Sequence, residues 1–168
     1  MNLYFLRHAK AEPRSPKWRP DSKRPLTKDG EKRMFDVARG MKKLDVPFDL
    51  ILTSPYARAL RTAQIVVETY HARKLFQTTK LSSDADPRGI IDEINDNFST
   101  LKDIILVGHE PFLSGLMSAL LTGESGLKID FKKAGLSKLT VSELRFGKCA
   151  CLDWLLTARQ LARIGKRS

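Results

Sequence analysis

Short apolar runs alternate with longer amphipathic stretches along this chain. Four of the runs have the length and β-prone composition of buried strands, and they cover residues 3–6, 48–52, 75–78 and 104–107. Between them, apolar residues recur every three or four positions, a spacing typical of helices that pack along one side. Strands that alternate with helices predict a mainly parallel sheet with helices on both faces.

The helices expected between these strands have recognisable starts and apolar sides. Thr27 or Asp29 can cap the first one, because either side chain can accept a hydrogen bond from a free backbone N–H. Three further helices are expected over residues 57–70, 87–94 and 112–121, the last ended by Gly123. The apolar side of the first helix consists of Met34, Val37, Ala38, Met41 and Leu44.

The C-terminal part of the chain has a weaker pattern. Strand-like pieces occur at 129–131, 136–141 and 149–155, and a last helix is expected near Arg159. One of these pieces can form an antiparallel edge strand, so the predicted fold is a three-layer α/β/α sandwich with a mainly parallel central sheet. The long polar loop over residues 11–28, which contains four prolines, is of a length that usually carries function.

The size and composition of the chain predict an ordinary globular protein. With 168 residues and 19.0 kDa it reads as one domain over residues 1–168, whose tail from about residue 160 is expected to fray. No apolar run approaches the ~20 residues needed to cross a bilayer. The start of the chain leads directly into a strand and lacks the pattern of a signal peptide. We therefore expect a cytoplasmic monomer that does not bind membranes.

The two cysteines are expected to be structural. Cys149 and Cys151 are one residue apart, a spacing unsuited to an ordinary disulfide. Two cysteines are also too few for a zinc site, and in a strand they would face opposite sides of the sheet.

The net charge of +11 raises the question of an anionic partner. Lysines and arginines are dense at 10–32, 128–133 and 159–168, but these stretches lack the interleaved aromatics of a nucleic-acid platform. No zinc-finger or RNP pattern is present either. The simpler interpretation is that this positive charge attracts phosphorylated or acidic substrates. We do not expect nucleic acid as a partner.

Two of the three histidines directly follow buried-strand signals. Arg7 and His8 follow the first strand, and His109 follows the strand at 104–107, with Pro111 suited to open the next helix. Open α/β sheets bind ligands at the carboxyl ends of their strands. The third histidine, His71, closes the helix at 57–70 and is expected to be solvated.

A third strand end adds an arginine to the same edge of the sheet. Arg58 falls in the first turn of the helix after Ser54-Pro55, near free backbone N–H groups that favour anions. Arg61, almost one turn further, can point the same way or lie on the surface. Arginines could hold the oxygens of a phosphoryl group while one histidine attacks phosphorus and the other stabilises the developing charge.

These motifs, taken in order, resemble the histidine phosphatase superfamily, also called the phosphoglycerate mutase-like or RHG family. The small size of the chain is similar to that of the SixA-type phosphohistidine phosphatases within it. The matching segments are Leu6-Arg7-His8, Lys23-Arg24-Pro25-Leu26-Thr27-x-x-Gly30, Ser54-Pro55-x-x-Arg58-Ala59-x-x-Thr62, Ala85-Asp86-Pro87, Val107-Gly108-His109-Glu110-Pro111 and Leu152-x-Trp154-Leu155-Leu156.

The resemblance implies a phosphoglycerate mutase-like fold and a phosphatase mechanism. His8 would be the nucleophile that becomes phosphorylated, Arg7 and Arg58 phosphate ligands, and His109 the second histidine at the phosphoryl group. It implies no cofactor and no metal, because arginines and histidine supply the positive charge. The implied partner is a phosphohistidine-bearing signalling protein of the histidine phosphotransfer type, with inorganic phosphate as the product.

Two departures from the family pattern bear on the substrate. Ala9 replaces the usual glycine after the histidine, so this position must avoid glycine-only backbone angles. The chain also has little room for the inserted segment that carries a general acid in larger members. Glu12, Asp21 and Glu110 are candidate acids, or carboxylates that brace loops. A phosphoramidate leaves as imidazole, which needs less acid assistance than an alkoxide, and this favours phosphohistidine.

Several alternatives stay open on the sequence. A small-molecule phosphomonoesterase or mutase of the same superfamily is the first, and a non-enzymatic basic module that binds anions or nucleic acid is a remote second. Four further residues could touch the substrate: Glu12, Arg61, Lys132 and Lys133.

Overall fold

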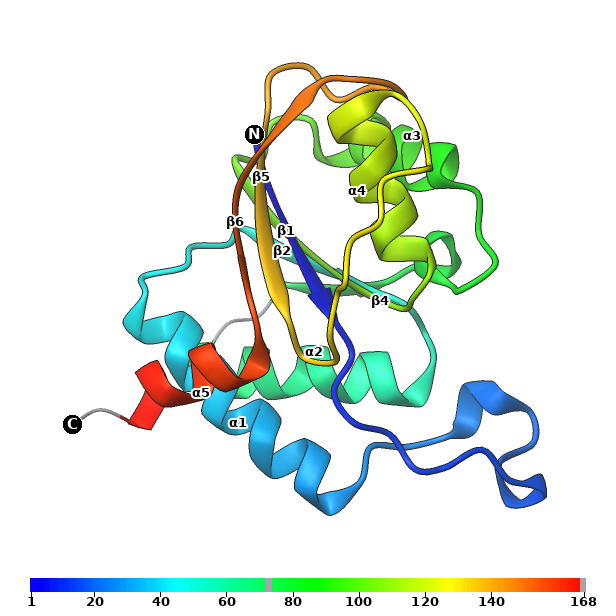
Figure 1. The fold of residues 1–168 in the computed structure, drawn as a ribbon, viewed down its shortest axis with the longest axis vertical. Helices are drawn as coiled ribbons and strands as arrows, with labels where there is room; N and C mark the ends of the chain where they lie inside the picture. Colours follow the sequence, from blue (N-terminus) through cyan, green and yellow to red (C-terminus); the bar gives the residue numbers. More distant parts are fainter. Residues whose placement is uncertain (72–73, 167–168) are drawn as a thin grey trace.

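One six-stranded sheet forms the centre of the molecule (Figure 1). The computed structural model describes residues 1–71 and 74–166. Along the sheet the strands follow the order β3-β2-β4-β1-β5-β6, and β1 to β4 run parallel to one another. The strands are β1 (Asn2–Arg7), β2 (Leu50–Thr53), β3 (Leu75–Gln77), β4 (Asp103–Gly108), β5 (Leu136–Val141) and β6 (Ala150–Leu156).

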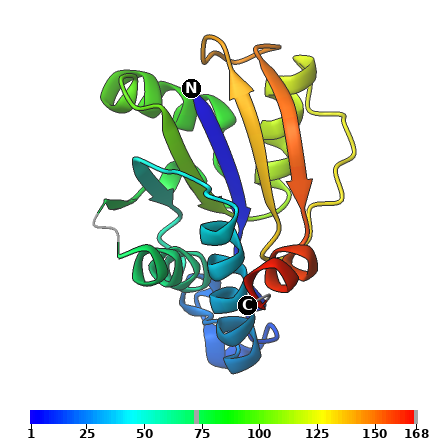
Figure 2. The same ribbon diagram turned by 90° about the vertical axis from the view of Figure 1, so that its left-hand side faces the viewer.

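Helices cover both faces of the sheet, as the two views together show (Figures 1 and 2). Helices α1, α2 and α5 pack on one face and α3 and α4 on the other, which confirms the expected three layers. None of the described helices is both long and apolar enough to cross a membrane. The helices are α1 (Lys28–Lys43), α2 (Ala57–Tyr70), α3 (Pro87–Phe98), α4 (Phe112–Thr122) and α5 (Ala158–Lys166), with 3-10 turns η1 (Pro16–Trp18), η2 (Asp21–Lys23) and η3 (Thr79–Leu81).

The central strand β1 supplies both hydrophobic cores. Because successive side chains of a strand point to opposite faces, Tyr4 and Leu6 pack in the core under α1 and α2. Leu3 and Phe5 pack in the core under α3 and α4. Burial on both faces explains why this strand is a continuous apolar run in the sequence rather than an alternating one.

The C-terminal strands differ from the expectation in two respects. The antiparallel strand is β5, which lies inside the sheet between β1 and β6, so β6 forms the edge. Residues 129–131 are not a strand. The Phe131 side chain is buried, but its carbonyl accepts a hydrogen bond from the Arg7 side chain instead of joining a ladder.

The ends of two helices also refine the prediction. Thr27, rather than Asp29, caps α1: its side-chain oxygen accepts a hydrogen bond from the backbone N–H of Gly30 at 2.9 Å. Leu44, expected on the apolar side of α1, lies just beyond the helix and is 41% exposed. His71 follows α2 as an exposed helix-end residue, as expected.

The described C-terminal segment is packed, where we expected fraying from about residue 160. Helix α5 runs to Lys166 and buries Leu161, Ala162 and Gly165. It crosses α1 so closely that a Cβ atom built on Gly40 would lie 2.0 Å from the Leu161 carbonyl oxygen. The apolar residues of the tail therefore belong to the core on the α1 face.

Candidate active site

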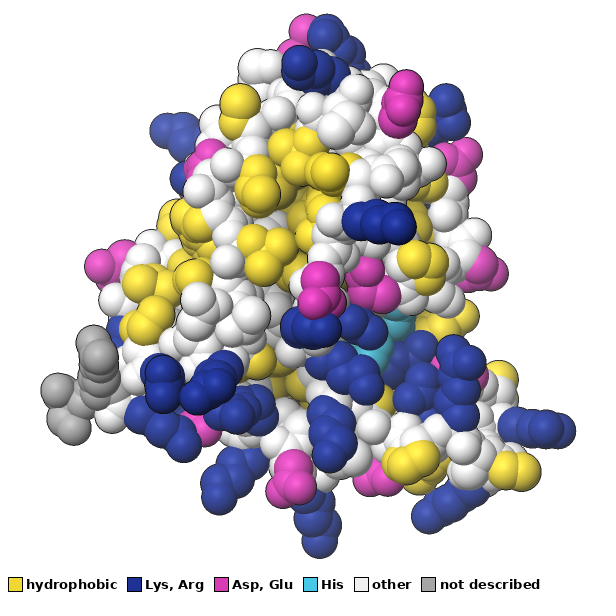
Figure 3. Space-filling model, in the orientation of Figure 1, with side chains coloured by type: hydrophobic (Ala, Val, Ile, Leu, Met, Phe, Trp, Pro, Cys, Tyr) yellow, Lys and Arg dark blue, Asp and Glu magenta, His cyan; other side chains and the backbone are white. Residues whose placement is uncertain are grey.

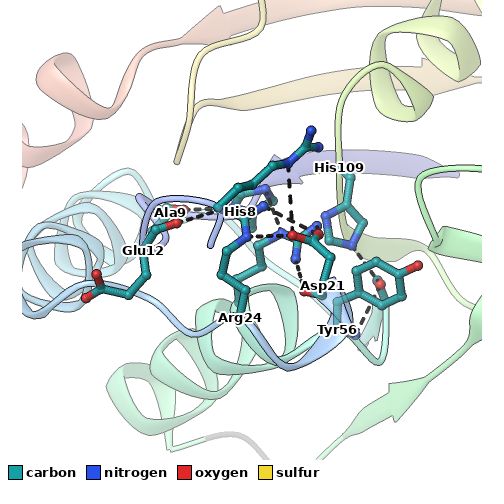
Figure 4. Close-up of polar contacts among 10 residues, drawn as sticks. His8, Ala9, Glu12, Asp21, Arg24, Tyr56 and His109 are labelled. Atoms are coloured by element: carbon teal, nitrogen blue, oxygen red, sulfur yellow. Dashed lines mark hydrogen bonds and ion pairs between the residues drawn. The ribbon is translucent and has the colours of Figure 1, made fainter. Parts of the chain in front are cut away.

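Three neighbouring parallel strands end at the candidate site. His8 follows β1, Ser54 follows β2 and His109 follows β4, and the sheet order β2-β4-β1 brings them together. The two histidine rings lie 5.1 Å apart between centroids, and only 6% of His8 and 2% of His109 are exposed. Figure 4 shows both rings in one cluster with Asp21 and Tyr56. The predicted convergence of the two histidines is confirmed.

One ring nitrogen of His8 is held as a hydrogen-bond donor. Its Nδ1 lies 2.7 Å from the Ala9 carbonyl oxygen, and a carbonyl can only accept, so Nδ1 carries the proton. The other nitrogen, Nε2, is then unprotonated, and its lone pair accepts a hydrogen bond from the Arg58 Nε–H at 3.3 Å. Held in this way, Nε2 of His8 is the nitrogen available for nucleophilic attack.

The second histidine keeps one nitrogen unsatisfied. His109 Nε2 is 2.8 Å from the hydroxyl of the fully buried Ser54, and the ring of Tyr56 packs 4.9 Å away. His109 Nδ1 is buried and has no partner among the described residues. A buried polar atom without a partner costs free energy, which a bound ligand can recover.

Arg58 lies between the histidines and a carboxylate. Its side chain is buried, and its two terminal nitrogens contact Asp21: Nη1 donates to the backbone carbonyl at 2.9 Å, and Nη2 is 3.1 Å from Oδ2. Asp21 is in turn held by Arg24, whose Nε lies 2.8 Å from Oδ1. The Tyr56 ring lies 5.1 Å from the guanidinium carbon of Arg58. The long loop thus holds Arg58 in place.

Arg7 contributes a further donor at the end of β1. Its Nη1 donates to the Phe131 carbonyl at 2.6 Å, which anchors the guanidinium on one side. Its Nε is buried and has no partner among the described residues. The Arg7 Nε–H and the Nδ1 of His109 are thus two unsatisfied buried groups at neighbouring strand ends.

Burial governs the protonation of both histidines. Desolvation, the largest cause, acts together with the charges of the nearby arginines, and the pKa of His8 and that of His109 are lowered to about 3. At neutral pH both rings are therefore uncharged. The pKa of Asp21 is also lowered, first by its hydrogen bond from Arg24, so this carboxyl is ionised.

The remaining candidate residues do not join this cluster. Arg61 lies in ion pairs with Glu31 and Glu68 at 3.1 and 2.7 Å, which hold it on the surface of α2. The carboxylate of Glu12 points away from the histidines (Figure 4), and only its backbone carbonyl braces Arg24. Lys132 and Lys133, next to the turn that contacts Arg7, are exposed, and Lys132 pairs with Asp130.

Two of the candidate acids have bracing roles in the structure, which agrees with the second of the two interpretations given for these carboxylates. Glu110 accepts a hydrogen bond from the backbone N–H of Ser114 and so caps α4, and Asp21 holds Arg24 and Arg58. Ala9 is not among the described residues with positive φ, so an alanine is accommodated there without strain.

Sequence reasoning named Asp21 only as a candidate acid or loop-bracing carboxylate, and it assigned no role to Arg24, Ser54 and Thr62. Thr62 accepts from the Ala9 backbone N–H at 3.1 Å and donates to the Arg58 carbonyl at 2.7 Å, which links the turn after His8 to α2. All four residues lie in or directly beside the matched motifs. The sequence did contain a signal for these residues, because each is a polar residue in or beside a motif that also holds a catalytic candidate.

Comparison with known proteins identifies the family of this chain. A model of the histidine phosphatase superfamily (branch 1) matches residues 3–81. An uncharacterized protein of Picosynechococcus sp. (strain ATCC 27264 / PCC 7002 / PR-6) is 35% identical over 141 residues, which cover 81% of this chain and 82% of the relative. The chain therefore belongs to the histidine phosphatase superfamily.

Solved structures agree on the fold. The protein histidine phosphatase SixA in complex with tungstate superposes with a TM-score of 0.82 at 21% identity, covering 96% of this chain and 99% of that one. Mycobacterial glucosyl-3-phosphoglycerate phosphatase, in complex with inorganic phosphate, gives 0.70 at 16% identity over 94% and 98%. The alpha-ribazole phosphatase from Shigella flexneri gives 0.65 at 19% identity over 94% and 97%. The fold is phosphoglycerate mutase-like.

Proposed function

We propose that this phosphatase removes the phosphoryl group from phosphohistidine on a signalling phosphotransfer protein. The observation that carries the proposal is the protonation of His8: its Nδ1–H is bound to the Ala9 carbonyl, which leaves the Nε2 lone pair at the site. The lowered pKa of His8 keeps Nε2 unprotonated at neutral pH. The likeness in fold to SixA supports the choice of substrate.

The proposed reaction has two steps with one intermediate. In the first, Nε2 of His8 attacks phosphorus, the bond between phosphorus and the substrate imidazole breaks, and its electron pair leaves with that imidazole. In the second, water attacks phosphorus, the His8 Nε2–P bond breaks, and inorganic phosphate is released. The two steps together return His8 to its starting state, with the proton on Nδ1 and the lone pair on Nε2.

Positive and polar groups around His8 would stabilise the transferring phosphoryl group. Arg58 already contacts Nε2, while the Nε–H of Arg7 and the Nδ1 of His109 are buried without partners. Donors placed in advance where negative charge develops stabilise the transition state without reorganisation. If Nδ1 of His109 is to donate, its Nε2 must accept from the Ser54 hydroxyl, and the 2.8 Å contact is compatible with this tautomer.

The carboxylates beside the site support a substrate with a good leaving group. Asp21 is ionised and paired with two arginines, Glu110 caps a helix, and Glu12 points away. None of these three can readily give a proton to an alkoxide. The imidazole of phosphohistidine can be protonated on its distal nitrogen before the P–N bond breaks, so it leaves as a neutral molecule.

Rates on two substrate classes test the proposal. We expect kcat/KM for a phosphohistidine-bearing phosphotransfer domain to exceed that for sugar phosphates and other alkyl phosphates, with aryl phosphates between them. The relatives in fold that act on small molecules make a phosphomonoesterase the competing function. Equal efficiency on alkyl phosphates and on the phosphoprotein would favour that competitor.

A further inference from the structure

A cleft of about 520 Å³ opens beside the candidate active site. The tip of the long loop, residues 14–19, forms one wall, and Tyr56 and Ser83 form the other. Two lining residues also belong to the site: Tyr56 packs on the ring of His109, and Asp21 pairs with Arg58. The residues that line the cleft include Arg14, Trp18, Arg19, Asp21, Tyr56 and Ser83.

The base of this loop is firmly held. Ala11 and Leu26 form a β-bridge, and the Glu12 backbone N–H donates to the Pro25 carbonyl at 3.0 Å. Arg24 crosses between the two sides, donating to the Glu12 carbonyl at 2.8 Å while it binds Asp21. The loop therefore presents its tip at a set position relative to the histidines.

Most of the positive charge at the tip is not paired with a carboxylate. The Arg14 side chain is 86% exposed, and its contact with Asp21 is long, at 4.0 Å. Among the described residues, no carboxylate forms an ion pair with Lys17 or Arg19, and Lys17 lies over the Trp18 ring at 4.8 Å. In Figure 3, lysines and arginines crowd the part of this face where histidine is visible.

Resting on the phosphohistidine function proposed above, we propose that this cleft binds an acidic side chain of the protein substrate next to its phosphohistidine. Arg14 and Arg19 would pair with the carboxylate, and Trp18 and Tyr56 would contact its aliphatic part. The site of phosphoryl transfer and the cleft share Tyr56 and Asp21, so both can be occupied by one substrate segment.

The exposure of the cleft indicates a protein segment rather than an enclosed small molecule. Small-molecule sites bury most of the ligand surface, whereas Arg14 and Arg19 both lie exposed at the tip of a surface loop. A side chain that projects from the surface of a large partner can reach such a cleft without being enclosed. Exposed ion pairs are individually weak, so the cleft would select among substrates rather than supply most of the affinity.

A pair of phosphohistidine peptides tests the assignment. One peptide carries glutamates around the phosphohistidine and the other carries glutamines at the same positions. We expect the wild-type protein to prefer the acidic peptide by about fivefold or more in kcat/KM, mainly through KM. In the double variant R14A/R19A this preference should fall to about one, and hydrolysis of phosphoimidazole should not change. The variant R159A, which removes an exposed arginine on α5, should keep the preference.

Unphosphorylated versions of the two peptides separate this inference from the proposed function. As competitive inhibitors of p-nitrophenyl phosphate hydrolysis, they report on the cleft even if no phosphohistidine is hydrolysed. Stronger inhibition of the wild type by the acidic peptide, lost in R14A/R19A, supports the cleft. A preference that survives in R14A/R19A, or no preference in the wild type, would overturn it. Wild-type failure on every phosphohistidine probe would instead reject the proposed substrate.

Discussion

The buried part of the candidate site, called the floor here and formed by His8, Arg58 and His109, differs in construction from the exposed tip of the long loop beside it. On the floor, His8, Arg58 and His109 are almost completely buried and come from strand ends or the first turn of a helix. At the tip, Arg14 and Arg19 are exposed and depend on the loop alone for their position. Most polar atoms on the floor have a defined partner, whereas Lys17 and Arg19 at the tip have no carboxylate partner among the described residues.

This difference separates two tasks. Bond making requires groups held within a fraction of an ångström, which the sheet and the buried hydrogen bonds provide. Selection of a partner requires charge that can adapt to another surface, which an exposed loop provides. Substitutions on the floor should therefore reduce the rate of chemistry, and substitutions at the tip should alter only the choice of substrate.

The largest expected effect is the loss of His8, the proposed nucleophile on the floor. In His8→Ala, turnover should fall by more than about 10⁴-fold, because no other group supplies the attacking lone pair. The measurement is hydrolysis of phosphohistidine protein, together with trapping of an acid-labile, base-stable phosphoenzyme. His71→Asn, which removes an exposed histidine from a left-handed helix end, is the matched control and should keep full activity. A normal phosphoenzyme in His8→Ala would refute the assignment.

A smaller loss of turnover is expected from substitution of Arg58, whose contacts depend on the shape of the guanidinium as well as on its charge. Arg58→Lys keeps the charge but loses the guanidinium that contacts both His8 and Asp21, so turnover should fall by about 10²–10³-fold. Arg61→Lys, one turn along the same helix, should stay near wild type because Arg61 only forms surface ion pairs. Comparable rates in the two lysine variants would show that Arg58 does not touch the phosphoryl group.

Burial of the histidines should also be visible in the stability of the protein. Since folding lowers the pKa of His109 from 6.5 to about 3, the unfolded chain binds more protons between these values, and stability falls as the pH falls through this window. The variant His109→Gln should reduce this slope by up to about 1.4 kcal/mol per pH unit. Urea unfolding between pH 4.5 and 7.5 measures it. An unchanged slope in this variant would contradict the burial of His109.

The smallest effect on catalysis is expected where loop and floor meet. Asp21→Asn keeps the size of the side chain but weakens its hold on Arg58, so kcat/KM should fall by about three- to tenfold. Asp130→Asn, which removes an exposed carboxylate paired with Lys132, serves as the control. If activity instead rises in Asp21→Asn, the carboxylate competes with the phosphoryl group for Arg58, and the link between the two regions is inhibitory.

The parallel half of the fold could be read from the sequence because it is encoded locally. Continuous apolar runs such as Leu3–Leu6 predict strands that are buried on both faces. The polar residues directly after these runs indicate where the candidate site lies. His8, His109 and Arg58 could all be found in this way. Each lies within a few residues of a strand end, so topology alone brings them together.

The other features depend on contacts between segments far apart in the chain. That β5 lies inside the sheet follows from its pairing with β1, and burial of the tail follows from the close crossing of α1 and α5 at Gly40 and Leu161. Neither contact leaves a periodic signal. The same holds for Asp21, since its two arginine partners are set by how the loop folds over the strand ends.

The central place of β1 has a consequence for how the molecule is made. This strand comes first in the chain, yet it pairs with β4 and β5, so that Leu3 lies opposite Ile104 and Leu139. During synthesis on the ribosome, the segment that bears His8 must wait until both partners have emerged. Such distant pairings slow folding, and they leave an apolar strand unpaired in the meantime. His8, the proposed nucleophile, is thus translated well before the two strands that hold it in place.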